Sequence, residues 1–215
     1  DNSFVAWNWL AGGSASSNSD GDITSSISAN TTAGFSVVSY TGSGTIGDTV
    51  GHGLGVKPAM IITKNRDSTA QWVVWHQGGT STKNTDLATN NAEYDSGASG
   101  WQQGINGVPT TSVLTFTAGS HGNTNVMDSS DKYVSYVFTE KKGYSKFGKY
   151  VGASATDGTF IYLGFRPAFF MAKAIGRDEN WYIFDNKRQG YNVDNDQLYP
   201  DVSNTEATTD YLDIL

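Results

Sequence analysis

The chain has 215 residues, of which 37 % are hydrophobic, 13 % aromatic and 16 % charged, with a formal net charge of −7 at pH 7. The hydrophobic fraction is large enough to form a folded core, and the charged fraction is too small for a disordered polyelectrolyte. The acidic balance argues against nucleic acid as a partner, because duplex binding depends on Lys and Arg at the phosphates. The complete lack of cysteine excludes disulfides and thiolate metal sites. No apolar run approaches the ~20 residues of a membrane-spanning helix, so we expect no membrane insertion.

The N-terminal region, residues 1–33, is predicted to hold a lone strand followed by an inserted hairpin. In Phe4–Trp9 (FVAWNW) one face carries Val5, Trp7 and Trp9. This alternation is typical of a half-buried strand. Asp20-Gly21 is a favoured hairpin turn, and the residues that alternate after it as a thin strand are Ile23, Ser25, Ile27 and Ala29.

The rest of the chain contains one series of motifs twice. GLGVKPAMIITKN at 53–65 is matched by LGFRPAFFMAKA at 163–174. The pairs that lie 109 positions apart are Gly34 with Gly143, Gly55 with Gly164, Pro58 with Pro167, Lys64 with Lys173, and Trp72 with Trp181. AGFSVVSYTG at 33–42 likewise matches KGYSKFGKYVG at 142–152, with a one-residue slip that brings the separation to 110.

Short apolar runs between Gly-rich turns favour strands over helices. We therefore predict an all-β protein of antiparallel β-sandwich units in internal tandem duplication, with a period of about 109 residues. The first full unit covers 34–142 and the second, incomplete unit covers 143–215. The second unit is expected to be truncated, because Leu215 precedes any counterpart of Val113–Thr117 or Tyr133–Phe138.

Phe4–Trp9 resembles Tyr133–Phe138 (YVSYVF), the strand that ends the first unit. An uncovered apolar edge invites strand addition, so we predict that Phe4–Trp9 completes the second unit, within the chain or from another copy. The rival interpretation is a piece of a longer tandem array whose neighbouring repeats supply both edges. The first residue, Asp1, also favours a processed product or an excised piece.

Aromatic residues are the best candidates for a glycan contact, because sugars stack their C–H faces on aromatic rings. Most tryptophans recur at strand positions, which favours core packing. Trp101 lies instead in the polar, loop-like segment SGASGWQQGING. We therefore select Trp101, with Tyr94 and Gln102, as candidate ligand-binding residues.

Two acidic runs, NSDGD at 18–22 and DNDQLYPD at 194–201, offer oxygen atoms to Ca²⁺. The candidate ligands are Asp20, Asp22, Asp194 and Asp196. Neither run has EF-hand spacing, and Asp and Asn are ordinary turn residues. The histidines show no metal spacing. We expect no cofactor and no metal site, with Ca²⁺ as the alternative.

Glycoside hydrolysis needs two carboxyl groups of different pKa, and the candidates are Asp128, Asp131, Asp178, Glu179 and Asp185. No active-site motif accompanies them, so we favour solvated loop acids and expect no enzyme. Four lysines gather in 140–149 (EKKGYSKFGK). They are interpreted as a protected strand edge, with contact to anionic glycans as the alternative.

The series FVAWNW, SISANTTAGFSVVSYTGSGT, VGHGLGVKPAMIITKN, WVVWH and GYSKFGKYVG resembles a repeated domain in virion and tail-fibre-like proteins of marine tailed bacteriophages. The resemblance covers most of the chain and fades across 78–109. The function of that domain is not established, and the resemblance brings no catalytic residues. It implies a structural or host-recognition module on the virion surface, outside the cell.

From this resemblance we expect a module of a tail fibre or other surface appendage. Its expected partners are copies of itself or neighbouring virion proteins, joined by strand addition, and a host-surface glycan. The alternatives are a tailspike-type polysaccharide depolymerase and a purely architectural decoration of the head or tail.

Overall fold

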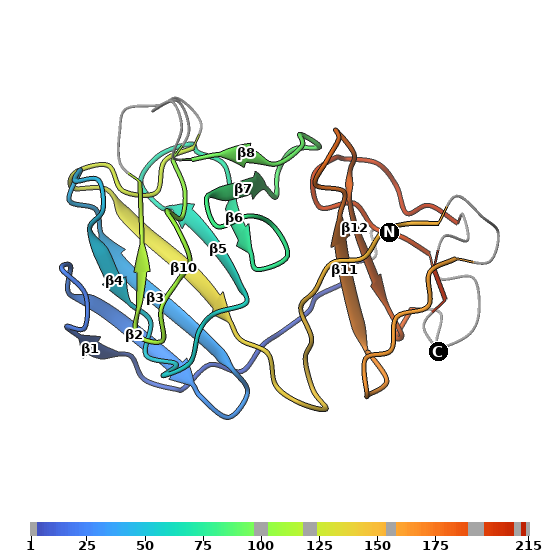
Figure 1. Cartoon of the computed structure of the whole chain (residues 1–215), viewed down its shortest axis with the longest axis horizontal. Coiled ribbons are helices and arrows are strands. Elements are labelled where there is room, and N and C mark those ends of the chain that lie inside the picture. Colours follow the sequence, from blue (N-terminus) through green and yellow to red (C-terminus); the bar gives the residue numbers. More distant parts are fainter. Residues whose placement is uncertain are drawn as a thin grey trace.

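The computed structural model describes residues 4–96, 103–117, 124–153, 158–188, 196–208 and 212–213. In these ranges the regular secondary structure consists of β-strands, so the all-β prediction is confirmed (Figure 1). Every strand pair within the sheets is antiparallel. The same ranges contain no helix of the length and apolar character needed to cross a membrane.

Eight strands form one large sheet, here called the main sheet, in the order β1-β2-β3-β10-β5-β6-β7-β8. Their bounds are Ser16–Asn18 (β1), Ser25–Asn30 (β2), Phe35–Thr41 (β3), Lys132–Phe138 (β10), Met60–Asn65 (β5), Val73–His76 (β6), Lys83–Asp86 (β7) and Tyr94–Asp95 (β8). Two smaller sheets pair β4 with β9 and β11 with β12. Their bounds are Thr49–Gly51 (β4), Val113–Thr115 (β9), Phe169–Lys173 (β11) and Trp181–Asp185 (β12).

The hydrophobic core is built from the main sheet and the β4–β9 pair in a sandwich-like arrangement. The main sheet contributes Ile27, Val38, Tyr40, Ile61, Val73, Trp75, Tyr133 and Val137. The residues from β4, β9 and the connecting segments are Val50, Leu54, Ile105, Leu114, Phe116, Val126 and Met127. Each fully buried large apolar side chain contributes about 1.5–3 kcal/mol to the free energy of unfolding.

Strand β10 is the centre of the main sheet, inserted between β3 and β5. Its burial alternates along the strand, with Tyr133, Ser135 and Val137 turned to the core. The buried Ser135 hydroxyl lies 2.7 Å from the Thr63 hydroxyl, so two polar groups in the core satisfy each other. The long crossover that brings β10 here also places Lys132 beside Arg66, whose amide donates to the Lys132 carbonyl.

The predicted N-terminal hairpin is present as β1 and β2, which add to the main sheet beside β3. Ile27 is buried in the core, and Ile23 and Ala29 pack against it. Residues 4–10 have no regular secondary structure in the single chain described, so Phe4–Trp9 is not paired as a strand with its own second unit; pairing with another copy stays a prediction. The segment has a strand's alternation, but the structure gives its backbone no ladder, and its contacts are made by tryptophan rings instead.

The hairpins β5–β6 and β11–β12 have the same register when they are compared at a separation of 109 positions. Ile61 pairs with Trp75 and Ile62 with Val74 in the first hairpin. At the matching positions of the second hairpin, Phe170 pairs with Phe184 and Met171 with Ile183. One hydrogen bond beside each hairpin is also repeated, from Gln77 N to Ala59 O (2.9 Å) and from Asn186 N to Ala168 O (3.2 Å).

The matched glycines before the two hairpins share a left-handed backbone. Gly34 and Gly143 have φ of 72° and 76°, and Gly55 and Gly164 have φ of 69° and 81°. The likeness stops outside these turns and the hairpin. Residues 142–152, predicted to match β3, form a turn and one isolated bridge between Lys141 and Ser145, so a strand there is wrong. Tandem duplication of the whole unit stays a prediction.

The β11–β12 hairpin is attached to the loop that follows β7. Backbone and side-chain hydrogen bonds connect residues 175–181 with residues 86–93: Trp181 Nε1 to Asp86 O, Glu179 N to Asn90 O, Glu93 N to Ile175 O and Ala92 N to Asp178 Oδ1. Trp9 contacts Phe138 of β10 and Phe169 of β11 with ring centroids 5.9 and 5.5 Å apart, so it bridges the two halves.

Candidate functional site

Of the three predicted glycan-contact residues, Trp101 and Gln102 lie outside the described residues. Tyr94 is the first residue of β8, and its ring is half-buried. Its hydroxyl donates to Asp86 Oδ1 (3.1 Å) and to the Gln103 carbonyl (3.4 Å). Burial raises the pKa of Tyr94 well above its ordinary value. In the described part of the chain, Tyr94 therefore links β8 to the end of β7 and to Gln103.

Two calcium candidates, Asp20 and Asp22, lie in the turn after β1. The Asp20 carboxylate accepts a hydrogen bond from Asn18 Nδ2 (2.8 Å). The Asp22 carboxylate accepts bonds from the Thr49 hydroxyl (2.7 Å) and the Thr49 amide (3.1 Å). These bonds, led by the hydroxyl, lower the pKa of Asp22. The Asp22 carboxylate joins β4 to the β1–β2 turn, and the Asp20 carboxylate joins that turn to the end of β1.

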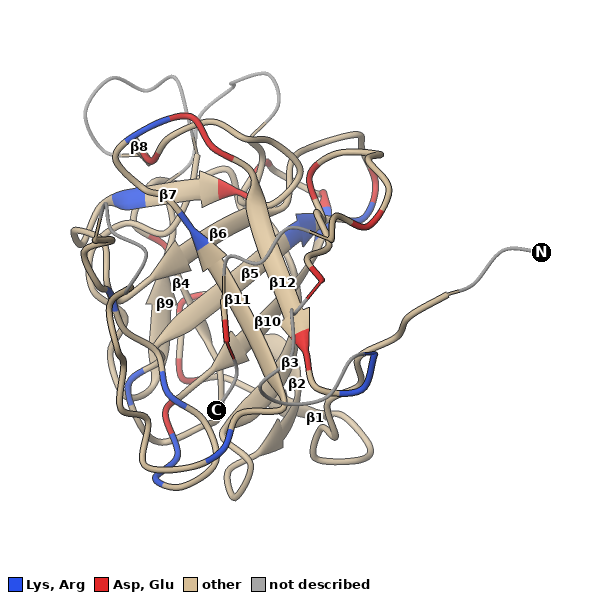
Figure 2. Cartoon of the chain, turned by 90° about the vertical axis from the view of Figure 1, so that its right-hand side faces the viewer, with Lys and Arg blue, Asp and Glu red and all other residues tan. Residues whose placement is uncertain are grey.

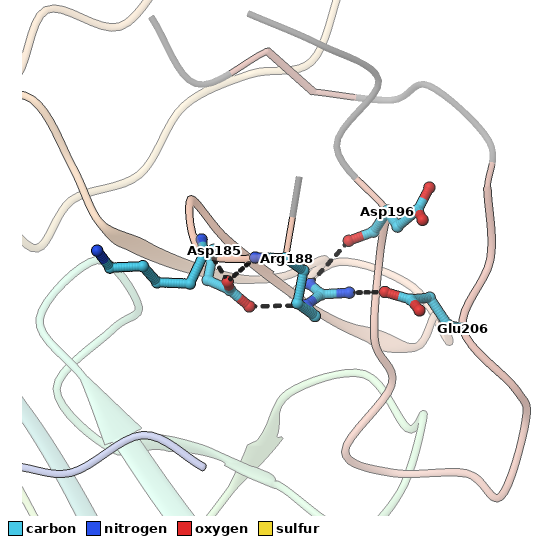
Figure 3. A network of polar contacts seen from close by, with 5 residues as sticks. Asp185, Arg188, Asp196 and Glu206 are labelled. Carbon is cyan, nitrogen blue, oxygen red and sulfur yellow. Dashed lines mark hydrogen bonds and ion pairs between the residues drawn. The ribbon is translucent and has the colours of Figure 1, made fainter. Parts of the chain in front are cut away.

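The third candidate, Asp194, lies outside the described residues, and Asp196 belongs to a network around Arg188 (Figure 3). Arg188 Nε donates to Asp185 Oδ2 (2.7 Å), and Arg188 Nη2 donates to the backbone carbonyl of Asp196 (2.9 Å). Glu206 completes the network through Arg188 Nη1. In the described ranges, His, Asp and Glu side chains form no group of three that could hold a metal ion.

Burial by itself raises the pKa of Asp185, but hydrogen bonds from Arg188 and from the Lys187 and Arg188 amides outweigh it, so the net pKa is lowered. The side chain of Asp185 is 3 % exposed and that of Arg188 is 14 % exposed. This ion pair is therefore shielded from solvent and fixes the segment after β12.

The remaining predicted carboxylates divide between two places. Asp128 accepts from Gln103 Nε2 (2.8 Å) and Asn125 Nδ2 (2.6 Å), and Asp131 accepts from Asn65 Nδ2 (2.7 Å). Asp178 and Glu179 lie instead in the turn between β11 and β12. Asn125 Nδ2 also lies 3.4 Å from Asp131 Oδ2, so one amide connects the two carboxylates near β10.

Sequence reasoning missed Asp86, the last residue of β7. Desolvation by burial raises its pKa to about 6, and the hydrogen bond from Tyr94 opposes the shift. No motif marks this position, because its environment is created by β8 and by Trp181 of β12, which donates to its carbonyl.

A polar groove on the main sheet was also missed. It has a volume of about 380 Å³ and is lined by Ala15, Ser16, Ser17, Thr24, Ser25, Ser26, Ser39, Tyr40, Thr41, Arg66 and Lys132. The strand register aligns Ser17, Ser26 and Ser39 in a row across β1, β2 and β3. The side chains of Arg66 and Lys132 are exposed at β5 and β10. The groove thus offers many hydroxyls and two cations, a set suited to sugar hydroxyls and anionic groups.

The second half of the chain exposes large apolar side chains. In the first half, Phe35 is 6 % and Tyr40 4 % exposed, whereas their sequence counterparts Tyr144 and Tyr150 are 62 % and 49 % exposed. Val151, Phe160 and Tyr162 are exposed in the same region. We call these five residues the exposed apolar set: Tyr144, Tyr150, Val151, Phe160 and Tyr162. Large apolar side chains left exposed within one stretch of chain are typical of interaction surfaces.

The fold and these sites define an all-β protein with an antiparallel main sheet, a polar groove and several exposed apolar side chains in its second half. The chain belongs to the family described as Domain of unknown function (DUF7483), which it matches over residues 1–215. No curated protein matches the chain. No solved structure matches it.

Proposed function

We propose that this chain is a non-catalytic assembly module of a larger surface structure, and specifically of a phage tail fibre or similar virion appendage. The observation that carries the assembly role is the exposure of Tyr144 and Tyr150, whose counterparts Phe35 and Tyr40 are buried in the first half. Exposed aromatic rings cost free energy in water and are covered in an assembly. The assignment to a virion appendage comes from the sequence resemblance.

Sedimentation velocity of the full chain at micromolar concentration tests the assembly role. The expected result is a defined oligomer that weakens in the double variant Phe160→Ser/Tyr162→Ser. The control is Val108→Ser, which removes an exposed apolar side chain of the first half. A stable monomer across the concentration range contradicts the proposal.

Glycan binding is the second candidate function, and the polar groove favours it. Its aligned serine hydroxyls can bind sugar hydroxyls, while Arg66 and Lys132 offer charge-assisted hydrogen bonds to a carboxylate or sulfate. An acidic polysaccharide would bind in a salt-dependent manner, because both cations are exposed.

Titration with an acidic polysaccharide such as alginate, against neutral dextran, tests this second function. Arg66→Gln/Lys132→Gln is expected to weaken alginate binding at least several-fold, whereas the matched Lys57→Gln/Lys187→Gln, which removes two exposed lysines elsewhere, leaves it unchanged. Equal binding by the groove variant and the unaltered chain contradicts binding in the groove. Loss in Lys142→Gln/Lys146→Gln alone would assign the contact to residues 140–149.

A further inference from the structure

Among the described residues, strand β11 has an unpaired edge, whereas both edges of its counterpart β5 in the first half are paired. In the main sheet, β5 lies between β10 and β6. Among the described residues, β11 has β12 as its strand partner. The far side of β12 is occupied, since Ile183 and Leu198 exchange backbone hydrogen bonds of 2.9 and 3.0 Å. The free edge of β11 is therefore the one that β10 occupies on β5.

The segment Phe4–Trp9 has the pattern of a strand for this edge. It matches Tyr133–Phe138 of β10 in its spacing of Val, aromatic and aromatic residues. The structure anchors the segment at its base, where Asn30 Nδ2 donates to Leu10 O (3.1 Å) and Ser28 Oγ to Gly13 O (2.7 Å). The rings of Trp7 and Trp9 contact Phe169 of β11 in the same chain, and beyond them the chain end projects away from the body of the molecule (Figure 2), where Phe4 is 89 % exposed. We call residues 4–9 the N-terminal arm.

The register of β10 on β5 gives a specific register for the arm on β11. Phe138 pairs with Met60 and Ser135 with Thr63. The acceptor residues Met60 and Thr63 correspond to Phe169 and Ala172, 109 positions later. The donor residues Phe138 and Ser135 correspond to Trp9 and Ala6, 129 positions earlier. The predicted pairs on β11 are therefore Trp9 with Phe169 and Ala6 with Ala172. The Trp9 and Phe169 rings already meet edge-to-face, with centroids 5.5 Å apart and planes at 89°.

We propose that the N-terminal arm of one copy pairs antiparallel with the free edge of β11 in a second copy, and that the exchange is reciprocal. The proposal names the partner of the assembly role proposed above and rests on it. A second copy is favoured over the arm's own chain for two reasons. Within its own chain the arm contacts β11 through the rings of Trp7 and Trp9, and among the described residues it makes no strand pairing there. The exposed apolar set also needs a cover larger than six residues. A reciprocal exchange gives a closed two-fold dimer with both edges paired.

Engineered cysteines test the register, because the chain has no cysteine of its own. The Ala6→Cys variant is mixed with a size-tagged Ala172→Cys variant of the full chain, equilibrated, oxidised mildly and separated on a non-reducing gel. The expected product is a covalent heterodimer. The matched control replaces Ala172→Cys with Met171→Cys, whose side chain points to the opposite face of β11 and which should cross-link far less.

The doubly substituted chain Ala6→Cys/Ala172→Cys separates the arm's two possible acceptors. A covalent dimer as the final product supports reciprocal exchange between copies, whereas a ladder of larger species shows one-way exchange and overturns the closed dimer. A disulfide confined to the monomer shows that the arm closes its own chain, and it overturns the proposal. No disulfide in either experiment, with the fold intact by far-UV circular dichroism, overturns it as well.

Deletion of residues 4–9 distinguishes failure of this inference from failure of the proposed assembly role. The arm contributes no residue to the hydrophobic core cluster, so the shortened chain should fold. We expect it to sediment as a monomer while the full chain sediments as a dimer. An oligomer that survives the deletion overturns the arm exchange and leaves the assembly role standing. A monomeric full chain overturns both.

Discussion

The indole Nε1 of Trp181 donates a 2.9 Å hydrogen bond to the backbone carbonyl of Asp86, which joins β12 to the end of β7. The Asp86 side chain lies beneath this junction, with Tyr94 donating to its Oδ1. The residue is 4 % exposed, so its carboxylate is removed from water without a cation beside it in the described contacts. A buried carboxyl group of this kind favours its protonated form.

The first prediction concerns the pH dependence of stability at Asp86. Burial raises its pKa from 3.8 to about 6 in the folded protein, so the folded state binds more protons than the unfolded state between these values. Stability from this group is therefore greatest at low pH and is lost as pH rises through 6. At pH 8, Asp86→Asn should raise the free energy of unfolding by about 1–3 kcal/mol. Urea unfolding at pH 8 and pH 4 measures the difference, which should nearly vanish at pH 4.

Asp185→Asn is the matched control for this prediction. The pKa of Asp185 is lowered in the folded state, so its contribution is present above the unfolded pKa and is lost as pH falls. Asp185→Asn should therefore destabilise the protein at pH 8, with a smaller effect at low pH. If both substitutions shift stability in the same direction at pH 8, the assigned environment of Asp86 is wrong.

The second prediction concerns the tautomer and charge of His52. The Leu54 amide donates to His52 Nδ1 (3.2 Å), so the proton of the neutral ring lies on Nε2 and points to the Thr110 carbonyl (3.3 Å). Burial lowers the pKa of His52, with the Thr110 contact opposing the shift. The folded state thus binds fewer protons, and stability falls as pH drops below about 6.5.

Nuclear magnetic resonance of ¹⁵N-labelled His52 should report the Nε2–H tautomer and a titration midpoint below the ordinary histidine value. His52→Gln should remove this part of the pH dependence, which is measured as the difference from the unaltered chain between pH 5 and pH 7. A midpoint at or above the ordinary value contradicts the assignment.

Local features of the fold were predictable from the sequence because they depend on short spacings. The β11–β12 hairpin has the same register as β5–β6, and glycines at matched positions adopt the same left-handed backbone. The lack of a strand at Phe4–Trp9 within one chain has a physical cause. Alternation specifies which face of a strand is apolar, but a strand forms only when a second backbone supplies the hydrogen bonds.

The groove and the Asp86 environment depend on contacts between distant segments, so spacing gives no access to them. Arg66 and Lys132 become neighbours because β10 inserts beside β5. Asp86 is enclosed by Tyr94 and Trp181, which come from β8 and β12. Of the three predicted glycan-contact residues, Tyr94 bonds to Asp86 and so links β8 to β7. The glycan contact of Trp101 stays a prediction.

The third prediction compares Tyr40 with its counterpart Tyr150. In the core, the Tyr40 ring stacks on Tyr133 (5.2 Å) and packs on Phe116 (5.3 Å), and its hydroxyl donates to the Val126 carbonyl (2.8 Å). Tyr40→Ala should lower the free energy of unfolding by about 3–5 kcal/mol. Tyr150→Ala should change it by less than about 0.5 kcal/mol in the isolated monomer. Chemical denaturation of both variants measures this, and comparable losses would contradict the structural difference between the halves.

The fourth prediction compares Gly34 with Gly143. Both have a left-handed backbone, so an alanine at either position costs about 1–2 kcal/mol. A Cβ at Gly34 would also lie 2.7 Å from Thr139 Cγ2 and 2.9 Å from Thr139 O, whereas a Cβ at Gly143 meets nothing within 4 Å. Gly34→Ala must therefore push β3 away from the end of β10, where the Thr139 amide donates to the Gly34 carbonyl.

The expected order of thermal stability is thus the unaltered chain, then Gly143→Ala, then Gly34→Ala. A D-alanine introduced at position 143 by semisynthesis removes the backbone strain and should restore the melting temperature there. Equal losses for the two L-alanine variants would mean that Thr139 moves aside freely and that the contact between β3 and β10 is loose at this end.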